Sequence, residues 1–212
     1  CGKYISIFCR YYGLKETEAA SGNQSTTIME TEMKNKTCKV FLIILTAMFI
    51  LPGCQKSSSG VDSYLKAQDK IMDQMMKDME LKEKTGSSSL AFLTGMIPHH
   101  ESAIEMSEEY LKYAPEDAHF RKLAEDIIMA QTSEIEQMKN MMEDIKSGYQ
   151  TDGTKEEAYL KEYDEMMEGH HSGHGSSDTQ DLDTAFAEGM VMHHQMAVDM
   201  AETIIKYSDN DS

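Results

Sequence analysis

Tryptophan is absent from this sequence of 212 residues, and proline occurs only three times. Methionine occurs 19 times, and such a composition suits helices with adaptable cores better than sheets. The length fits one domain or two small ones. No cysteine lies beyond residue 54, since the four are Cys1, Cys9, Cys38 and Cys54. Residues 55–212 therefore contain neither a disulfide nor a thiolate metal site, and a metal site there must use His, Met, Asp or Glu.

Basic residues are also scarce, which restricts the partners that we expect. The formal net charge is −17, from 20 basic and 37 acidic residues. Residues 55–212 keep 14 of the basic and 33 of the acidic residues, a net charge of −19. A surface this acidic argues against nucleic acid and anionic lipid as partners, and it attracts cations without selectivity.

One apolar run lies near the start of the chain. VFLIILTAMFIL, residues 40–51, follows three lysines, and it is too short to span a bilayer, which takes about 20 apolar residues. A positive segment followed by a short apolar run is typical of an export signal. We therefore interpret residues 34–54 as a signal peptide and residues 1–33 as upstream sequence outside any domain.

The signal ends in LPGC, residues 51–54, which resembles a bacterial lipoprotein box whose cysteine becomes the lipidated first residue. Pro52 is unusual inside such a box, and the alternative is an ordinary cleaved signal with Cys54 present by chance. Gln55 is not the aspartate associated with inner-membrane retention. We expect a protein of the cell envelope, anchored by lipid at Cys54 to the outer membrane facing the periplasm, or to the extracytoplasmic surface.

A motif rich in Met and His occurs twice in the rest of the chain. Residues 92–113 read FLTGMIPHHESAIEMSEEYLKY, and residues 186–207 read FAEGMVMHHQMAVDMAETIIKY. At a constant offset of 94 residues, ten positions of the two copies are identical, and eight of them bear on the argument. In the first copy these are Phe92, Gly95, Met96, His99, His100, Ala103, Met106 and Tyr113, and in the second Phe186, Gly189, Met190, His193, His194, Ala197, Met200 and Tyr207.

Helical periodicity places the Met and His side chains of each copy on one face. At 100° per residue, five positions of the first copy fall within an arc of about 120°. They are Met96, His99, His100, Ala103 and Met106. Thioether sulfur and neutral imidazole form a ligand set that suits copper, Cu(I) in particular. The competing interpretation is a core in which methionines fill gaps and histidines are tolerated. The second copy favours the metal site, although repetition by itself shows duplication only.

The helical geometry also suggests which ligands act together. Adjacent histidines point about 100° apart, so His99 and His100 are not expected to reach one ion with ideal geometry. We expect Met96 to act with His100 and His99 with Met106, and either Glu134 or Met138 to complete the site from the following helix. The alternative for Glu134 is a surface carboxylate. The same spacing pairs Met190 with His194 and His193 with Met200.

The remaining segments read as helices joined by short loops. We expect a flexible tether over 55–61, a first helical unit over 62–147, and an incomplete second unit over 148–212. The expected helices cover residues 62–84, 90–113, 117–146, 156–168 and a segment beginning near 181. Pro98 should kink or loosen the second of them.

A loop rich in Gly, Ser and His, residues 169–178, precedes the second copy. Its histidines His170, His171 and His174 predict loose, unselective metal binding. A solvated polar linker is the alternative.

The second copy lacks the long helix that follows the first copy. Five residues follow Tyr207, against about 35 that continue the first unit. We expect its apolar face to be covered by the Met-rich first helix, by a second chain in a homo-oligomer, or not at all.

Two stretches carry a resemblance to a known family. F-x-x-x-M-I-P-H-H-x-x-A-x-x-M, from Phe92 to Met106, and A-x-x-I-I-x-x-Q-x-x-E-I-x-x-M, from Ala124 to Met138, resemble the ferritin-like domain-of-unknown-function family number 305. The second copy matches the first half of this pattern only, with Met192 in place of the proline. The resemblance implies a ferritin-like, antiparallel helical bundle, export from the cytoplasm and, for some members, copper binding.

These observations favour an exported protein that sequesters or buffers copper, as Cu(I), with the metal ion as its partner and the membrane reached through the lipid anchor only. We expect no enzymatic activity and no organic cofactor. One alternative is a structural or adaptor bundle whose Met faces simply pack. Another is a ferritin-like metal oxidase, for which the sequence offers a single E-x-x-H, from Glu116 to His119.

Overall fold

The computed structural model describes residues 58–148, 152–171 and 179–208. The expected upstream segment, the signal peptide and Cys54 lie outside these residues, as does His174. The described part contains five helices and no strand, so the prediction of an all-α bundle is confirmed. The helices are α3 (Ser58–Asp78), α4 (Ser88–Tyr113), α5 (Arg121–Gly148), α6 (Gly153–His171) and α7 (Leu182–Tyr207).

The two helices that carry the motif begin at side chains that cap them. The Ser87 hydroxyl accepts a hydrogen bond from the backbone N–H of Leu90 at 3.2 Å. The Asp181 carboxylate accepts one from the N–H of Thr184 at 2.8 Å. Such caps satisfy backbone donors that have no partner inside the helix. Despite Pro98, α4 is a single helix over its whole length.

Both ends of α3 differ from the expectation, and packing explains the first. α3 begins at Ser58, inside the segment 55–61 expected to be a tether, because Val61 is buried in the core and its burial offsets the weak helix propensity around it. At the other end α3 stops at Asp78 instead of Lys84, and the chain turns at Gly86, whose φ of 84° favours glycine.

The duplication extends over two more helices than the sequence analysis recognised. α3 contains Y-L-K-x-x-D-x-x-M from Tyr64 to Met72, and α6 contains the same pattern from Tyr159 to Met167 at an offset of 95 residues. Tyr64 and Tyr159 are both fully buried. The repeated unit is therefore a helical hairpin, α3–α4 in the first half and α6–α7 in the second.

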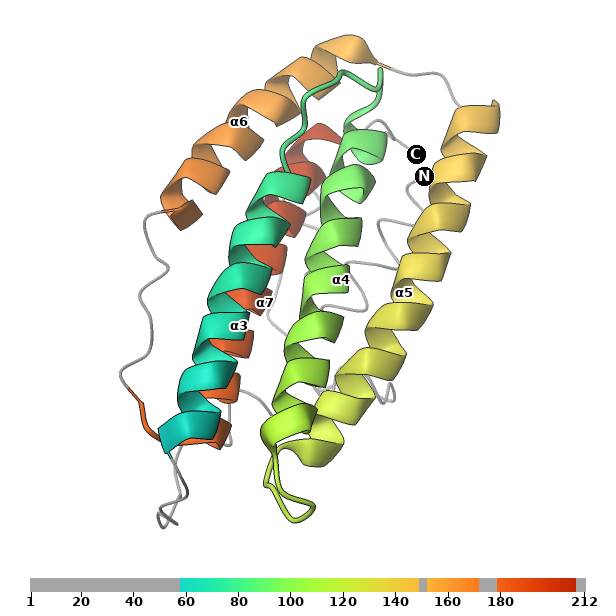
Figure 1. The fold of residues 1–212 in the computed structure, drawn as a ribbon. Coiled ribbons are helices and arrows are strands. Elements are labelled where there is room, and N and C mark those ends of the chain that lie inside the picture. Colours follow the sequence, from blue (N-terminus) through green and yellow to red (C-terminus); the bar gives the residue numbers. More distant parts are fainter. Residues whose placement is uncertain (1–57, 149–151, 172–178, 209–212) are drawn as a thin grey trace, which may run out of the picture.

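The two hairpins pack into one four-helix core, and α5 lies on its flank. α4 and α7 contact each other, α3 contacts both, and α6 contacts both, while α5 packs along α4. Figure 1 shows α3 and α4 side by side with α7 behind them and α5 on the far side of α4. The second copy, on α7, is in contact with α3 and with α6. Cover by the first helix was one of the three expectations, and α6 adds to it.

A glycine at the same motif position lets each hairpin approach the other. A Cβ added to Gly95 of α4 would lie 2.8 Å from the hydroxyl of Tyr163 on α6. A Cβ added to Gly189 of α7 would lie 2.4 Å from Nε2 of Gln68 on α3. Both separations are shorter than van der Waals contact allows, so a side chain at either glycine would require Tyr163 or Gln68 to move.

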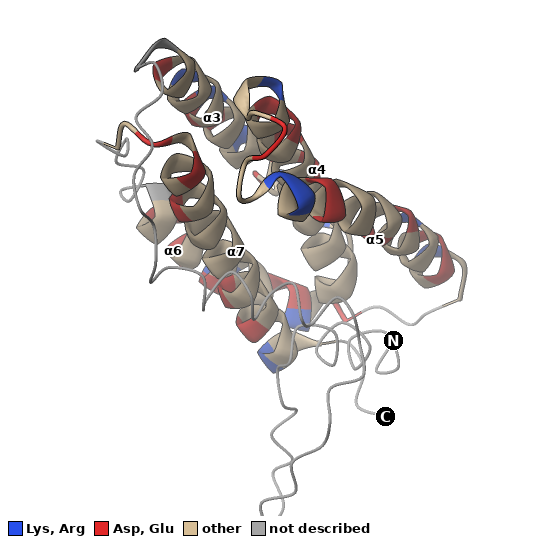
Figure 2. Ribbon diagram, turned by 90° about the horizontal axis from the view of Figure 1, so that it is seen from below, with Lys and Arg blue, Asp and Glu red and all other residues tan. Residues whose placement is uncertain are grey.

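Acidic residues are spread over the outside of this bundle. Figure 2 shows Asp and Glu along each helix and fewer Lys and Arg between them. Within the described ranges, no helix has both the length and the apolar character needed to cross a membrane.

Candidate functional site

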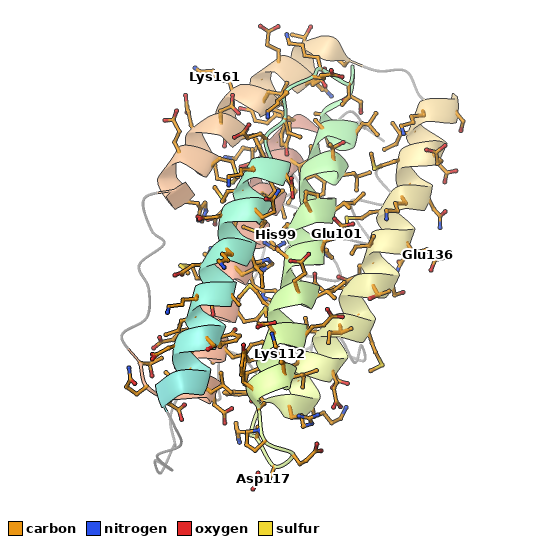
Figure 3. The ribbon with its side chains drawn as sticks, viewed as in Figure 1. His99, Glu101, Lys112, Asp117, Glu136 and Lys161 are labelled. Carbon is orange, nitrogen blue, oxygen red and sulfur yellow. The ribbon has the colours of Figure 1, made fainter. Side chains whose placement is uncertain are left out.

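The four histidines of the two motifs meet in the middle of the four-helix core. The rings of His99 and His193 lie with their centroids 3.8 Å apart, and each is followed by a second imidazole, His100 at 6.0 Å from His99 and His194 at 5.5 Å from His193. All four side chains are buried. Figure 3 shows His99 directed into the interior between α3 and α4. The prediction that these residues share inward-facing surfaces is confirmed.

The predicted methionine ligands lie in the same core. Each is at most 1% exposed, and the five belong to one continuous cluster of buried residues. Three helices supply them: α4 supplies Met96 and Met106, α5 supplies Met138, and α7 supplies Met190 and Met200.

Backbone carbonyls fix the protonated nitrogen of His99 and His193. His99 Nε2 lies 2.8 Å from the carbonyl oxygen of His193, and His193 Nε2 lies 3.0 Å from the carbonyl oxygen of His99. A carbonyl can only accept, so Nε2 carries the hydrogen in both rings. Ser102 joins this pair, since its hydroxyl donates to the His99 carbonyl at 2.6 Å and lies 2.8 Å from His193 Nε2.

The other nitrogen of each of these two rings is a bare acceptor. With Nε2 protonated, Nδ1 of His99 and of His193 carries a lone pair. Both Nδ1 atoms are buried, and neither has a hydrogen-bond partner among the residues that the structure describes. A buried acceptor without a partner is costly and calls for an explanation, and a bound ion is one.

In His100 and His194, Nδ1 carries a hydrogen. Nδ1 of His100 lies 3.0 Å from the Met96 carbonyl oxygen, and Nδ1 of His194 lies 2.8 Å from the Met190 carbonyl oxygen. In both rings Nδ1 therefore donates to the carbonyl four residues earlier, and Nε2 is the nitrogen that faces α5. The equivalent methionines hold these rings through their backbone.

Helix α5 meets both of these nitrogens. Glu134 Oε2 lies 3.0 Å from His100 Nε2, so this carboxylate of the following helix contacts one of the histidines of the motif. Gln131, one turn earlier, places its Nε2 3.4 Å from His194 Nε2. Gln131 is the glutamine of the family pattern between Ala124 and Met138, but sequence reasoning did not identify it as a site residue. Its three-residue spacing from Glu134 was the available signal.

Burial keeps three of the imidazoles neutral. Loss of solvent lowers the pKa of His99 and of His193 well below the ordinary value, and the neighbouring imidazoles lower it further. Burial also lowers the pKa of His194 to about 4. At neutral pH these rings have the uncharged form that a metal ion requires.

The His-rich segment departs from its predicted loop at its start. α6 continues to His171, so Gly169, His170 and His171 are helical, while 172–178 lie outside the described residues. His170 is half-buried, and its Nε2 lies 2.9 Å from Asp199 Oδ2 on α7. His170 thus has a specific partner on the core, and its role as a weak metal ligand, with His171 and His174, stays a prediction.

Carboxylates and imidazoles alone do not form a complete site. Among the described residues, no group of three or more His, Cys, Asp or Glu side chains is placed to hold one ion. A metal ion at these imidazoles would need thioether sulfur as a further ligand, which the surrounding methionines can supply. The E-x-x-H of Glu116 and His119 lies between α4 and α5 and is exposed, away from this core.

Comparison with curated proteins gives a match that covers only a short part of the chain. An uncharacterized protein, L153 of Acanthamoeba polyphaga mimivirus, is 40% identical over 55 residues, which are 26% of this chain and 36% of that protein. The match therefore spans little more than a third of the relative. No solved structure matches the chain, so the ferritin-like form of the bundle stays a prediction.

A family model covers most of the chain. The model described as "Domain of unknown function (DUF305)" matches residues 45–142 and again residues 89–212. The two matches overlap at α4 and α5, and together they include both copies of the Met/His motif. With more than half of its residues matched, this chain belongs to the DUF305 family.

Proposed function

We propose that this protein binds Cu(I) through the buried His and Met side chains of α4 and α7 and thereby sequesters or buffers copper in the cell envelope. The observation that carries the proposal is the pair of bare Nδ1 atoms of His99 and His193. Each Nδ1 carries a buried lone pair that receives no hydrogen bond, and it belongs to a ring whose tautomer is already fixed by a backbone carbonyl. An ion that binds there satisfies an acceptor that folding leaves unpaired.

The chemistry of the surroundings favours a soft, monovalent ion. The imidazoles of His99 and His193 are neutral, and the nearby methionines offer sulfur, a set that suits Cu(I). A divalent ion would bring more charge into a core where Glu134 is the carboxylate in contact with an imidazole of the motif. The resemblance to copper-binding members of the family points to the same metal.

The main alternative is a structural or adaptor bundle whose Met and His residues only pack. It leaves the two bare nitrogens unexplained. A metal oxidase has less support, because the exposed position of Glu116 and His119 does not favour an inward-facing carboxylate and histidine site. We therefore propose a binding protein and not an enzyme.

Replacement of His99, His100, His193 and His194 by Ala should abolish tight Cu(I) binding. An anaerobic titration of the full chain against a chromophoric Cu(I) chelator measures this directly. The matched control replaces His170, His171 and His174 by Ala, and it should lose only weak Cu(II) or Zn(II) binding. Unchanged Cu(I) stoichiometry in the fourfold variant would return these histidines to a packing role.

A second variant separates ligand loss from misfolding. Met→Leu changes conserve volume and cost little in a core, about 1.5 kcal/mol or less each. Met96→Leu, Met106→Leu, Met190→Leu and Met200→Leu together should keep the helical circular dichroism spectrum and lower the Cu(I) affinity. A folded variant with the parent affinity would show that sulfur is not a ligand.

The location in the envelope rests on residues 34–54 and is tested separately. Cys54→Ala should leave the chain unprocessed or release it from the membrane fraction, because it removes the atom that would carry the lipid. Fractionation and the mass of the mature chain are the measurements, and Cys38→Ala is the control. An unchanged membrane fraction with an unchanged mass would exclude the lipid anchor.

A further inference from the structure

Three methionines near the end of α3 stand where the second half of the chain has three histidines. The offset is the 95 residues that relate the Y-L-K-x-x-D-x-x-M patterns of α3 and α6. M-M-x-x-M in the first half thus corresponds to H-H-x-x-H in the second. The residues are Met75, Met76 and Met79 on one side and His170, His171 and His174 on the other.

Packing alone does not account for this exchange. Methionine is apolar and fills gaps in a core, whereas a histidine buried without a partner is costly. Thioether sulfur and neutral imidazole nitrogen have in common that they bind soft or borderline metal ions. Met72, one turn before Met76, shows the pattern that packing predicts, because its counterpart Met167 is also a methionine and both are buried.

We propose that Met75, Met76 and Met79 form a second Cu(I) site at the end of α3. Three neutral thioethers are soft ligands, and they suit this soft, monovalent ion. The site is separate from the four-histidine core of α4 and α7. It goes beyond the proposed function, since either site can bind copper without the other.

The backbone keeps the three side chains on one face. Met79 is four residues after Met75 and three after Met76, and such spacings make side chains neighbours on a helix. α3 ends at Asp78, but Met79 keeps the helical spacing because its N–H donates to the Met75 carbonyl at 2.9 Å. Methionine side chains are unbranched and flexible, so their sulfur atoms can turn toward one ion.

The site lies on the buried side of this helix end. The three methionines are at most 3% exposed. From α6, the Tyr163 hydroxyl donates to the Met79 carbonyl at 2.9 Å, and the same hydroxyl lies against Gly95 of α4. The end of α3 is thereby held between α4 and α6, so the ligands are positioned before any ion binds.

The charge of the ion is compensated in part. The carbonyls at the C-terminal end of a helix carry a partial negative charge, and Met79 lies at that end of α3. The carboxylates beside it in the sequence, Asp78 and Glu80, are exposed, and solvent screens them. A carboxylate contacts the four-histidine core directly, since Glu134 lies 3.0 Å from His100. We therefore expect the α3 site to bind Cu(I) more weakly than that core.

The test is an anaerobic Cu(I) titration of the full chain against two chromophoric chelators of different strength. The three histidines of the H-H-x-x-H pattern are replaced by Ala in every sample, so that they bind no copper. This reference protein should bind Cu(I) in a tight step and a weak step. Replacement of all three α3 methionines by Leu should remove the weak step and keep the tight one. The change conserves volume, so the helical circular dichroism spectrum should not change.

Met72→Leu with Met167→Leu is the matched control. It removes two buried thioethers from positions that hold Met in both halves, and one of them lies on α3. Both steps should be unchanged. If this control also removes the weak step, any buried methionine serves, and the inference of a defined site is wrong.

Methionine methyl resonances identify the ligands directly, because Cu(I) is diamagnetic and leaves them sharp. With methionine labelled at the methyl carbon, the weak step should shift the signals of Met75, Met76 and Met79. The signal of Met72 should stay in place. Shifts of equal size at all buried methionines would contradict the proposal.

Failure of this inference and failure of the proposed function give different results. If the reference protein binds Cu(I) in the tight step only, or if the triple Leu variant keeps the weak step, the α3 site is absent while the core still binds copper. If replacement of the four core histidines by Ala leaves the tight step in place, the proposed function is wrong, and the weak step alone decides on the α3 methionines.

Discussion

Below pH 6.5 the metal-free bundle should lose stability steeply, by up to about 4 kcal/mol per pH unit from its buried imidazoles. Burial lowers the pKa of His99, His193 and His194 below their ordinary value of 6.5, and that of His194 reaches about 4. In the unfolded chain all three rings take up protons below pH 6.5, whereas in the folded chain they stay neutral. Since the unfolded state binds more protons, the free energy of unfolding falls as the pH falls.

The sign and window of this effect are specific. Stability from these rings is fully present above pH 6.5 and is lost as the pH falls toward the folded pKa, near 4 for His194. Each ring contributes about 1.4 kcal/mol per pH unit within that window. Urea unfolding of the metal-free protein between pH 6.5 and about pH 5 measures the slope, in a range where exposed carboxylates are still ionised.

His194→Gln is the informative variant for this slope. It removes one titrating ring and should flatten the dependence by about 1.4 kcal/mol per pH unit, whatever its effect at neutral pH. His119→Gln, at an exposed position, is the control and should leave the slope unchanged. A flat dependence in the parent protein would mean that the imidazoles are solvated in the folded state.

Glu156→Ala should destabilise the fold by about 2–4 kcal/mol. Glu156 is 1% exposed, near the start of α6, and its carboxylate accepts hydrogen bonds from the turn between α3 and α4. The donors include the Thr85 hydroxyl at 2.7 Å, the Thr85 backbone N–H and the Gly86 N–H at 2.9 Å. Removal of the carboxylate leaves the two backbone donors without this partner and opens a cavity between the hairpins, while the Thr85 hydroxyl keeps the Ser87 carbonyl as an acceptor at 2.8 Å.

The neighbouring glutamate is a natural control. Glu157 is exposed, and its carboxylate lies 3.4 Å from the Lys84 ammonium in a solvent-exposed ion pair. Glu157→Ala should therefore lower the free energy of unfolding by less than about 1 kcal/mol. Urea unfolding compares the two variants, and hydrogen exchange at the Thr85 and Gly86 amides localises the change. Equal destabilisation by the two substitutions would exclude the role that we assign to Glu156.

The same carboxylate has a pH dependence of its own. Burial opposes its ionisation, but the hydrogen bonds from Thr85 and Gly86 and the nearby Lys84 outweigh burial and lower the pKa of Glu156 below its ordinary 4.5. Its contribution to stability is therefore present above pH 4.5 and is lost as the pH falls through the lowered pKa. This loss follows that of the imidazoles on the acid side.

Local patterns of the sequence were sufficient to predict the helices and the inward faces of the motif. The spacing of Met and His fixes which side of a helix is buried, and burial of His99 and His193 follows from it. The pairing of His100 with Glu134 was also within reach, because a carboxylate on an apolar stripe needs a partner.

Features that depend on how the hairpins meet were not predictable in this way. The ring contact between His99 and His193 joins residues 94 positions apart, and only the packing of α4 on α7 brings it about. The Glu156 contact depends on the path of the loop before α4. The Y-L-K-x-x-D-x-x-M repeat was visible in the sequence, but its offset of 95 residues differs by one from that of the longer motif.

The contact between α4 and α7 has the form of an isologous interface, in which residue i of one unit meets residue j of the other and j meets i. His99 donates to the carbonyl of His193 while His193 donates to the carbonyl of His99. A hydrogen bond also joins the two helices near each end of this antiparallel contact: Tyr110 donates to Asp183, and Ser88 donates to the carbonyl of Tyr207. A chain with a single α3–α4 hairpin would thus present a self-complementary surface, and two such chains could form a C2 dimer with the same four-imidazole core. Because one chain carries both halves, their sequences need not be identical. α5 accordingly contacts His100 through Glu134 and His194 through Gln131.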